Sequence, residues 1–110
     1  VEASHSSLFG TVKILRSRPD RDGQFRRVYF HDGLVQNTVD SGGRSLSFYT
    51  HALEALAYAY RPELRSALVL GLGAGIVPMR FAARGVDTAV VEIDPVSLQV
   101  ARRFFGFDPA

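Results

Sequence analysis

The sequence contains no cysteine among its 110 residues. Disulfide bonds, thiolate zinc sites and cysteine nucleophiles are therefore excluded within this chain. It also lacks an apolar run approaching the roughly 20 residues that span a bilayer, and no signal-peptide pattern follows Val1. These absences fit a cytoplasmic protein, which we expect, although a membrane-attached context for a full-length protein stays open as an alternative.

Charge of one sign is nowhere concentrated. The 13 basic and 11 acidic side chains give a net charge of +2, and the chain contains no polycationic segment. We therefore expect no nucleic-acid partner. The three histidines, His5, His31 and His51, share no metal-ligand spacing, and we expect no bound metal. With 46% hydrophobic and 22% charged residues, the composition indicates a globular protein.

The first part of the chain has the pattern of an antiparallel sheet. Apolar and polar residues alternate, and Asp32-Gly33 is a dipeptide favoured in two-residue hairpin turns. The predicted strands are 8–16, 24–30 and 34–39. We predict that residues 1–44 form a small antiparallel β module built from these three strands.

A helix is expected next, from about residue 46 to residue 60, because apolar side chains recur at helical spacing. The apolar positions of this helix are Tyr49, Ala52, Leu53, Leu56, Ala57 and Tyr60. The pattern predicts that this face is buried.

A glycine-rich turn is the most informative feature of the chain. Residues 67–70 form an apolar run too short for a helix, as expected of a parallel strand covered on both faces. Gly71, Gly73 and Gly75 follow, and they let the backbone turn sharply and approach a ligand closely. Glu92 lies 21 residues beyond Gly71, near the roughly 20-residue spacing at which an acidic side chain meets ribose hydroxyls. This arrangement is typical of adenosine-cofactor sites.

The spacing of the glycines separates cofactor classes. A dinucleotide fingerprint is Gly-x-Gly-x-x-Gly, but Ile76 stands where its third glycine should be. The spacing Gly-x-Gly-x-Gly instead resembles the first motif of S-adenosylmethionine-type enzymes, which disfavours NAD. The alternative is that the glycines serve only a tight strand-to-helix connection and that Glu92 is a solvated strand end.

These patterns predict an α/β fold. The β module is followed, over residues 45–110, by the first βαβ part of a Rossmann-like parallel sheet of the S-adenosylmethionine type. Gly85 is expected to cap the helix after the glycine turn, and Asp94 to cap a helix that follows the second strand. A doubly wound domain needs about five parallel strands, whereas two are predicted here. We therefore expect the chain to be a fragment of a longer protein.

Taken in order, these pieces resemble the polyamine aminopropyltransferases, the family of the spermidine and spermine synthases. The matching pieces are the β module, Asp32-Gly33-Leu34-Val35-Gln36, a helix that starts near Tyr49, the glycine turn and Val90-Val91-Glu92-Ile93-Asp94-Pro95. The likeness covers most of this chain, but only the first half of such an enzyme.

The resemblance implies roles for individual residues. Gln36 is similar to the glutamine near the methionine-derived tail of the aminopropyl donor, and Tyr49 to the tyrosine that lines the amine-acceptor pocket. The three glycines of the turn would face the thioadenosine, and Glu92 would accept hydrogen bonds from both ribose hydroxyls. The base of the family is an aspartate after a later strand, beyond Ala110. No catalytic residue is therefore predicted within this chain.

The sequence departs from the family pattern at three places. The family has Tyr-His-Glu at the helix start, where this chain has Tyr49-Thr50-His51. It has an acidic pair a few residues earlier, which is missing here, and an aspartate in the glycine turn, where this chain has Ala74. Polyamines are multiply cationic, so missing carboxylates weaken the expectation of a polyamine pocket more than that of a nucleotide pocket.

The expected function is aminopropyl transfer from decarboxylated S-adenosylmethionine to a small-molecule amine, by an enzyme that forms a homodimer. Two alternatives stay open. One is a methyltransferase that uses S-adenosylmethionine itself, and the other is a non-catalytic relative that serves as an interaction domain. The sequence leaves the acceptor, the donor and the activity of the intact protein undecided.

Overall fold

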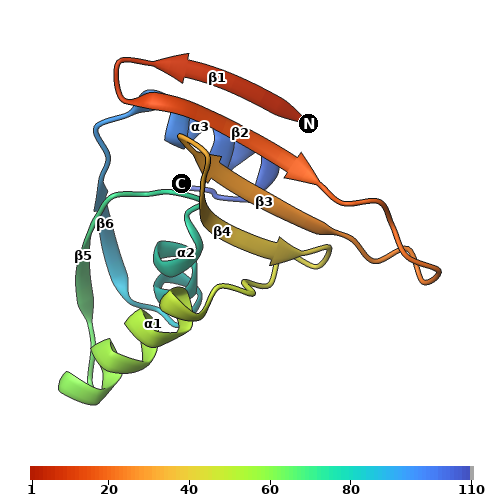
Figure 1. The fold of residues 1–110 in the computed structure, drawn as a ribbon. Coiled ribbons are helices and arrows are strands. Elements are labelled where there is room, and N and C mark those ends of the chain that lie inside the picture. The colour runs from red at the N-terminus through yellow and green to blue at the C-terminus, as the bar shows by residue number, and fades with distance from the viewer. Residues whose placement is uncertain (110) are drawn as a thin grey trace. The chain divides into compact units, whose positions relative to one another are not determined.

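The computed structural model describes residues 1–109 of the chain. These residues form two compact units, Val1–Ser47 and a second unit that begins at Phe48 (Figure 1). The first unit contains a four-stranded antiparallel sheet, and the second contains a two-stranded parallel sheet with helices. The chain is therefore mixed α/β. Among the described residues, no helix combines the length and the apolar character that crossing a membrane requires.

The sheet of the first unit has the order β1-β2-β3-β4, so each strand pairs with its neighbour in sequence. Its strands are β1 (Ala3–Ser7), β2 (Gly10–Arg16), β3 (Arg26–His31) and β4 (Leu34–Asp40). The sequence predicts three of these strands and misses β1. Its Ala-Ser-His-Ser-Ser sequence lacks the apolar alternation that marks a half-buried strand. Pairing with β2, from Ala3↔Ile14 to Ser7↔Gly10, holds β1 in place.

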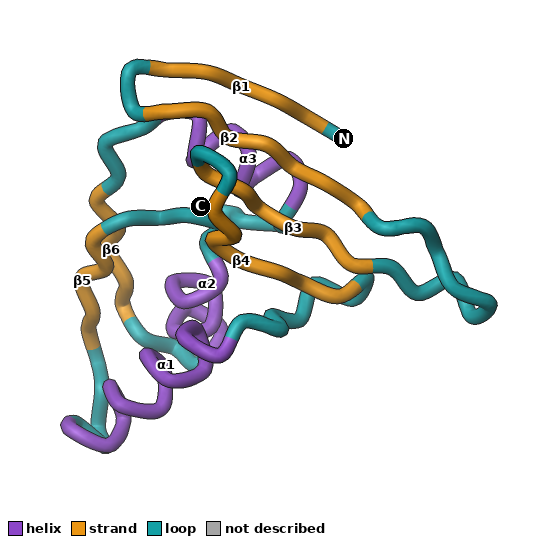
Figure 2. The backbone as a smooth tube through the Cα atoms, viewed as in Figure 1, coloured by secondary structure: helices purple, strands orange, loops and turns teal. Residues whose placement is uncertain are grey.

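The turn between β3 and β4 confirms the predicted hairpin. Asp32 and Gly33 have φ values of +49° and +79°, and positive φ at both central residues is the requirement of a type I′ turn. The carboxylate of Asp32 also accepts a hydrogen bond from the Thr11 N–H at 2.8 Å, which fastens this turn to β2. The longer connection between β2 and β3, residues 17–25, is a loop (teal in Figure 2).

The core of the first unit follows the alternation of its strands. Val12 and Ile14 of β2 are buried while Lys13 between them is exposed, as the sequence predicts. Tyr29 of β3 and Val39 of β4 are buried as well. The residues on this inner face therefore provide the apolar burial that stabilises the sheet.

The second unit is built around a parallel strand pair. Its elements are α1 (Phe48–Tyr60), β5 (Ser66–Leu70), α2 (Ile76–Ala83), β6 (Asp87–Val91) and α3 (Pro95–Phe104). β5 and β6 pair in parallel, with a register from Ser66↔Asp87 to Leu70↔Val91, and α2 connects them. The predicted βαβ unit is thus confirmed, whereas its membership of a larger Rossmann-like sheet stays a prediction.

The capping residues that the sequence predicts stand at the ends of α2 and α3, whereas α1 begins at Phe48, two residues after its predicted start. Gly85, with φ +79°, follows α2, and its N–H donates to the carbonyl of Ala82 at 3.0 Å. Asp94 caps α3, because its carboxylate accepts a hydrogen bond from the Val96 N–H at 3.0 Å and Pro95 occupies the first turn. Both predicted caps are confirmed.

One face of the parallel pair remains open to solvent. Val69 and Val90 are half-buried, but Leu68 and Leu70 are 64% and 77% exposed. The expectation that this strand is covered on both faces is wrong for the described residues. α2 crosses from β5 to β6 over one face, and alternate side chains of a strand point to opposite faces.

The orientation of α1 also corrects an expectation. The helix is present, but the apolar stripe that we expect in the core is largely exposed. Its exposed members are Tyr49, Leu53, Leu56 and Tyr60. The buried stripe is polar and contains Thr50 and Glu54, with exposed fractions of 4% and 8%.

The reason for this orientation is an ion-pair cluster between α1 and α2. The Glu54 carboxylate accepts a hydrogen bond from Arg80 Nε at 3.1 Å and another from Arg84 Nη1 at 3.4 Å. The guanidinium of Arg84 also lies 3.9 Å from the centroid of the Tyr58 ring, a cation–π contact. Hydrogen bonding from Arg80 lowers the pKa of the Glu54 carboxyl, so this side chain is held ionised against α2.

Candidate functional site

The glycine turn and Glu92 lie at the same edge of the parallel strand pair. The turn follows the last residue of β5, and Glu92 follows the last residue of β6. Because the strands are parallel and Leu70 pairs with Val91, both carboxyl ends are adjacent. The Gly71 N–H continues the pairing by donating to the Val91 carbonyl at 2.7 Å. The structure therefore brings together the two features that the sequence singles out.

The glycine turn uses a conformation that suits glycine at three alternate positions. The φ values of Gly71, Gly73 and Gly75 are +88°, +54° and +79°, which an L side chain rarely adopts. The residues between them, Leu72 and Ala74, are buried, at 7% and 2% exposure. The turn is thus anchored by its side-chain-bearing residues and by the buried Gly75, while Gly71 is exposed and Gly73 is half-buried.

The three glycines differ in the space beside them. At Gly71 and Gly73, an added Cβ would meet no atom of the described residues within 4 Å, apart from the chain neighbours. At Gly75, an added Cβ would lie 2.7 Å from the Phe107 ring. Gly71 and Gly73 therefore leave room for a ligand to approach. Gly75 packs against Phe107 and begins α2 as its N-cap, and a ligand contact there remains a prediction.

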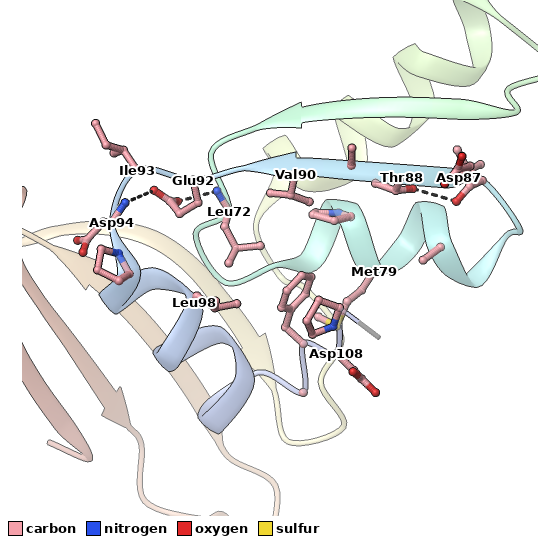
Figure 3. Close-up of a pocket in the computed structure, with 18 residues that line it drawn as sticks. Leu72, Met79, Asp87, Thr88, Val90, Glu92, Ile93, Asp94, Leu98 and Asp108 are labelled. Atoms are coloured by element: carbon pink, nitrogen blue, oxygen red, sulfur yellow. Dashed lines mark hydrogen bonds between the residues drawn. The ribbon is translucent and has the colours of Figure 1, made fainter.

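Glu92 is half-buried and bridges two loops (Figure 3). Its Oε1 accepts a hydrogen bond from the Leu72 N–H at 2.8 Å, and its Oε2 accepts one from the Asp94 N–H at 3.0 Å. Both donors are uncharged backbone groups, so these contacts leave the negative charge of the carboxylate unpaired. An ionised carboxylate offers about four acceptor directions. One direction on each oxygen therefore remains for a further donor.

A cleft of about 1060 Å³ lies beside Glu92 (Figure 3). Its described lining includes Leu72 but none of the three glycines of the turn, together with apolar side chains of α2, β6 and α3. The apolar lining residues include Leu72, Met79, Val90 and Leu98. Four of the described lining residues are acidic and none is lysine or arginine. The acidic residues are Asp87, Glu92, Asp94 and Asp108. The cleft can therefore hold an apolar or aromatic body that carries positive charge.

The remaining two predicted site residues are placed differently. Gln36 is an exposed residue of β4, in the first unit. Tyr49 stands in the first turn of α1, 47% exposed, and is not among the described residues that line the cleft. Their contacts with donor and acceptor remain predictions. The described residues also include no group of three or more histidine, aspartate or glutamate side chains placed to hold a metal ion.

Sequence reasoning missed two features of this region. The backbone N–H groups of Leu72 and Asp94 bind Glu92, but residue types carry no signal for such contacts because they depend on loop geometry. Phe107 packs on Gly75, and nothing in the spacing of these residues indicates it. The ion pairs of Glu54 had a weak signal, since Arg80 of α2 and Arg84, its C-cap residue, are four residues apart and so lie on one side of the helix.

Comparison with known proteins gives two partial matches. One segment of 53 residues, 46% of this chain, is 40% identical to part of a polyamine aminopropyltransferase from Vibrio vulnificus. Another segment of 40 residues, 36% of the chain, is 48% identical to part of an N-terminal histidine N-methyltransferase from Emericella nidulans. The chain is thus similar, in part, to two kinds of transferase.

The matched segments make up 18% of the aminopropyltransferase and 7% of the methyltransferase. This chain therefore spans less than a fifth of the length of either relative. No protein-family model matches the chain, and no solved structure matches it significantly.

Proposed function

We propose that the second unit binds the adenosine part of an S-adenosylmethionine-type donor and serves a transferase. The observation that carries this proposal is the adjacency of Glu92 to a glycine turn with open space beside Gly71 and Gly73. Backbone without side chains permits close approach of a ligand. A carboxylate at the end of the neighbouring strand then lies where a ribose of that ligand would be held.

The ribose contact is supported by the charge and hydrogen bonding of Glu92. Its two backbone partners orient the carboxylate and leave one acceptor direction on each oxygen. Two vicinal hydroxyls supply two donors, one for each oxygen. Hydrogen bonds to an ionised acceptor are stronger than those between neutral groups. The arrangement therefore favours a ligand with an intact diol over its deoxy analogue.

The acidic cleft favours decarboxylated S-adenosylmethionine as the donor. The relatives matched by this chain belong to enzyme families that use S-adenosylmethionine or its decarboxylated form. Both forms carry a sulfonium cation, which acidic walls attract, but only S-adenosylmethionine has a carboxylate. The described lining residues include no lysine or arginine to pair with that carboxylate. The proposed reaction is accordingly aminopropyl transfer to a small amine.

In this reaction the donor supplies a carbon activated by the adjacent sulfonium, which a neutral amine attacks. The contribution of this chain is to position the donor, a step that can lower the barrier substantially. Gln36 would contact the tail of the donor and Tyr49 would line the acceptor side. The reaction also requires removal of a proton from the amine, and we assign that step to no residue described here.

Methyl transfer is the second candidate. The segment that is 48% identical to an N-terminal histidine N-methyltransferase favours it. Ala74, which stands where the resembling family has an aspartate, adds no negative charge that would repel the carboxylate of S-adenosylmethionine. Backbone N–H groups of the turn would then bind this carboxylate. A non-catalytic interaction domain is the third candidate, and it predicts that neither donor binds.

Isothermal titration calorimetry on the intact protein tests this proposal. Both donors are titrated separately, each in the presence and absence of methylthioadenosine as a competitor that shares the adenosine part. Aminopropyl transfer predicts tighter binding of the decarboxylated donor, and methyl transfer predicts the reverse order. Absence of binding at millimolar concentration for both donors would contradict both enzyme proposals.

We also propose a homodimer that pairs through the first unit, and a cytoplasmic location stays a prediction. β1 and β4 are the outer strands of the antiparallel sheet, and an outer strand presents backbone groups that can pair with another chain. Sedimentation velocity over a range of protein concentrations tests the dimer. A monomer at every concentration would contradict it.

A further inference from the structure

The carboxylate of Glu92 connects two loops that are separate in sequence. Leu72 belongs to the glycine turn after β5, and Asp94 is the N-cap residue of α3 after β6. Each oxygen of Glu92 accepts a hydrogen bond from the backbone of one loop (Figure 3). A single side chain therefore ties the turn to the start of the next helix.

Both residues that donate these bonds are buried. Leu72 and Asp94 are 7% and 4% exposed. A buried backbone N–H that loses its acceptor carries a desolvation penalty, so such groups are nearly always paired. Glu92 therefore has a role that exists before any ligand arrives, because it satisfies two backbone groups that water reaches poorly.

We propose that Glu92 is a positioning residue as well as a ligand contact: it fixes the glycine turn against the start of α3 in the ligand-free protein. The ligand then meets a preformed site and need not order these loops itself. The statement that a ligand meets a preformed site rests on the proposed function. The positioning role of Glu92 concerns the ligand-free protein alone, so the two statements are separable by experiment.

The substitution Glu92→Gln probes this role with little change in size. Glutamine has one acceptor oxygen, and its other terminal atom is a donor that cannot accept from an N–H. The variant can therefore keep one of the two bonds, while the second N–H faces another donor. We expect one loop to lose its hydrogen bond to the side chain at position 92 and the other loop to retain it.

Amide hydrogen exchange, measured by NMR on the intact ligand-free protein, tests the inference. In Glu92→Gln, the amide of Leu72 or of Asp94 should exchange at least about tenfold faster. Loss of a hydrogen bond to a charged group raises the population of the open, exchange-competent loop by more than about tenfold. The Gly71 amide, bonded to the Val91 carbonyl, serves as an internal reference and should not change. Unchanged exchange at both Leu72 and Asp94 would overturn the inference.

Asp87→Asn is the matched control. Asp87 is an exposed carboxylate of β6 that lines the same cleft, and no described hydrogen bond joins its side chain to either loop. Its substitution removes the same charge and should leave both amides unchanged. An equal acceleration in this variant would mean that lost charge, and not a lost acceptor, loosens the loops, which also contradicts the inference.

Donor binding to the same proteins separates the two proposals. Faster exchange in Glu92→Gln, with no donor bound by the wild-type protein, supports the positioning role and refutes the proposed function. Donor binding that Glu92→Gln weakens, with unchanged amide exchange, refutes the positioning role and supports the ribose contact. Should Glu92→Gln not fold, Glu92→Asp takes its place, because a side chain one methylene shorter keeps the charge but cannot reach both loops.

Discussion

Two glutamates of the second unit have the same side chain but accept hydrogen bonds from different kinds of donor. Glu54 lies between α1 and α2 and accepts hydrogen bonds from the guanidinium groups of Arg80 and Arg84. Glu92 lies at the edge of the strand pair and accepts from the backbone of Leu72 and Asp94. Both carboxylates are held in place, but only that of Glu54 is held by cations.

This difference separates a structural carboxylate from one available to a ligand. The charge of Glu54 is neutralised within the protein, so its contacts hold the two helices together. Among the described residues, the charge of Glu92 meets only neutral N–H groups, which orient it without cancelling it. A ligand with hydroxyl donors or positive charge can therefore gain from Glu92 what it cannot gain from Glu54.

The largest expected effect is on ligand affinity in Glu92→Ala. This change removes both proposed bonds to the ribose hydroxyls. We expect affinity for the donor to fall by at least about a hundredfold, because the two hydrogen bonds to a charged group contribute about 1.5–3 kcal/mol each. The fold should be retained in thermal unfolding. Calorimetry measures the affinity, and an unchanged dissociation constant would discredit the ribose contact.

Glu54→Gln should have the opposite profile. Loss of this carboxylate leaves Arg80 and Arg84 without their partner, and we expect the free energy of unfolding to fall by about 1–2 kcal/mol. The larger cost of breaking a fully buried ion pair does not apply, because the arginine side chains are 58% and 51% exposed. Urea unfolding measures the change. Donor affinity should stay within twofold of wild type.

Glu63→Gln is the control for this stability effect. Glu63 is exposed, and no described ion pair involves it. Its substitution should change the free energy of unfolding by less than about 0.5 kcal/mol, as expected for a surface position. Equal destabilisation by both variants would show that the contacts of Glu54 contribute nothing specific.

A smaller effect distinguishes Gly71 of the glycine turn from Gly85, which follows α2. Gly71 and Gly85 have similar φ values, +88° and +79°, and neither has described side chains close enough to obstruct a Cβ. Alanine at either position should cost about 1–2 kcal/mol through backbone strain. Only Gly71→Ala should also lower donor affinity, because its Cβ would enter the open space at the turn through which we propose that the donor approaches. Equal affinities in the two variants would contradict the proposed approach of the ligand.

The sequence predicts the features that depend on local backbone preferences better than those that depend on tertiary contacts. The type I′ turn at Asp32-Gly33 and the cap at Asp94 follow from what these residues do to their own backbone, so the sequence suffices. β1 has a polar sequence, and only its pairing with β2 makes it a strand. The apolar stripe of α1 indicates a helix, but it cannot reveal that Glu54 faces Arg80 of α2 and Arg84 at its C-cap.

The candidate site likewise combines features that are visible in the sequence with features that only tertiary contacts determine. Alternate glycines and an acid about 20 residues later are visible in the sequence because the βαβ unit fixes their distance along the chain. The acceptor role of Glu92 toward Leu72 and Asp94 is not visible, because every residue type except proline provides a backbone N–H. The packing of Phe107 on Gly75 is likewise a tertiary contact without a local signature.

The smallest expected effect is a pH dependence that separates the two glutamates without a ligand. Hydrogen bonding from Arg80 lowers the pKa of Glu54 below its ordinary value of 4.5. A carboxyl whose pKa is lower in the folded state stabilises the protein above its unfolded pKa and loses this contribution as the pH falls toward its folded pKa. Glu2 shows the same direction through Arg27, so wild type alone cannot isolate Glu54.

A comparison of wild type with Glu54→Gln isolates the contribution of the Glu54 carboxylate to stability. The difference in free energy of unfolding between these two proteins should be largest near neutral pH and should shrink as the pH falls below about 4.5, where the carboxyl of the unfolded chain becomes protonated. Urea unfolding at a series of pH values measures this difference. A difference that stays constant from neutral to acidic pH would mean that Glu54 acts through its shape and not its charge, and the contrast with Glu92 would then lose its electrostatic basis.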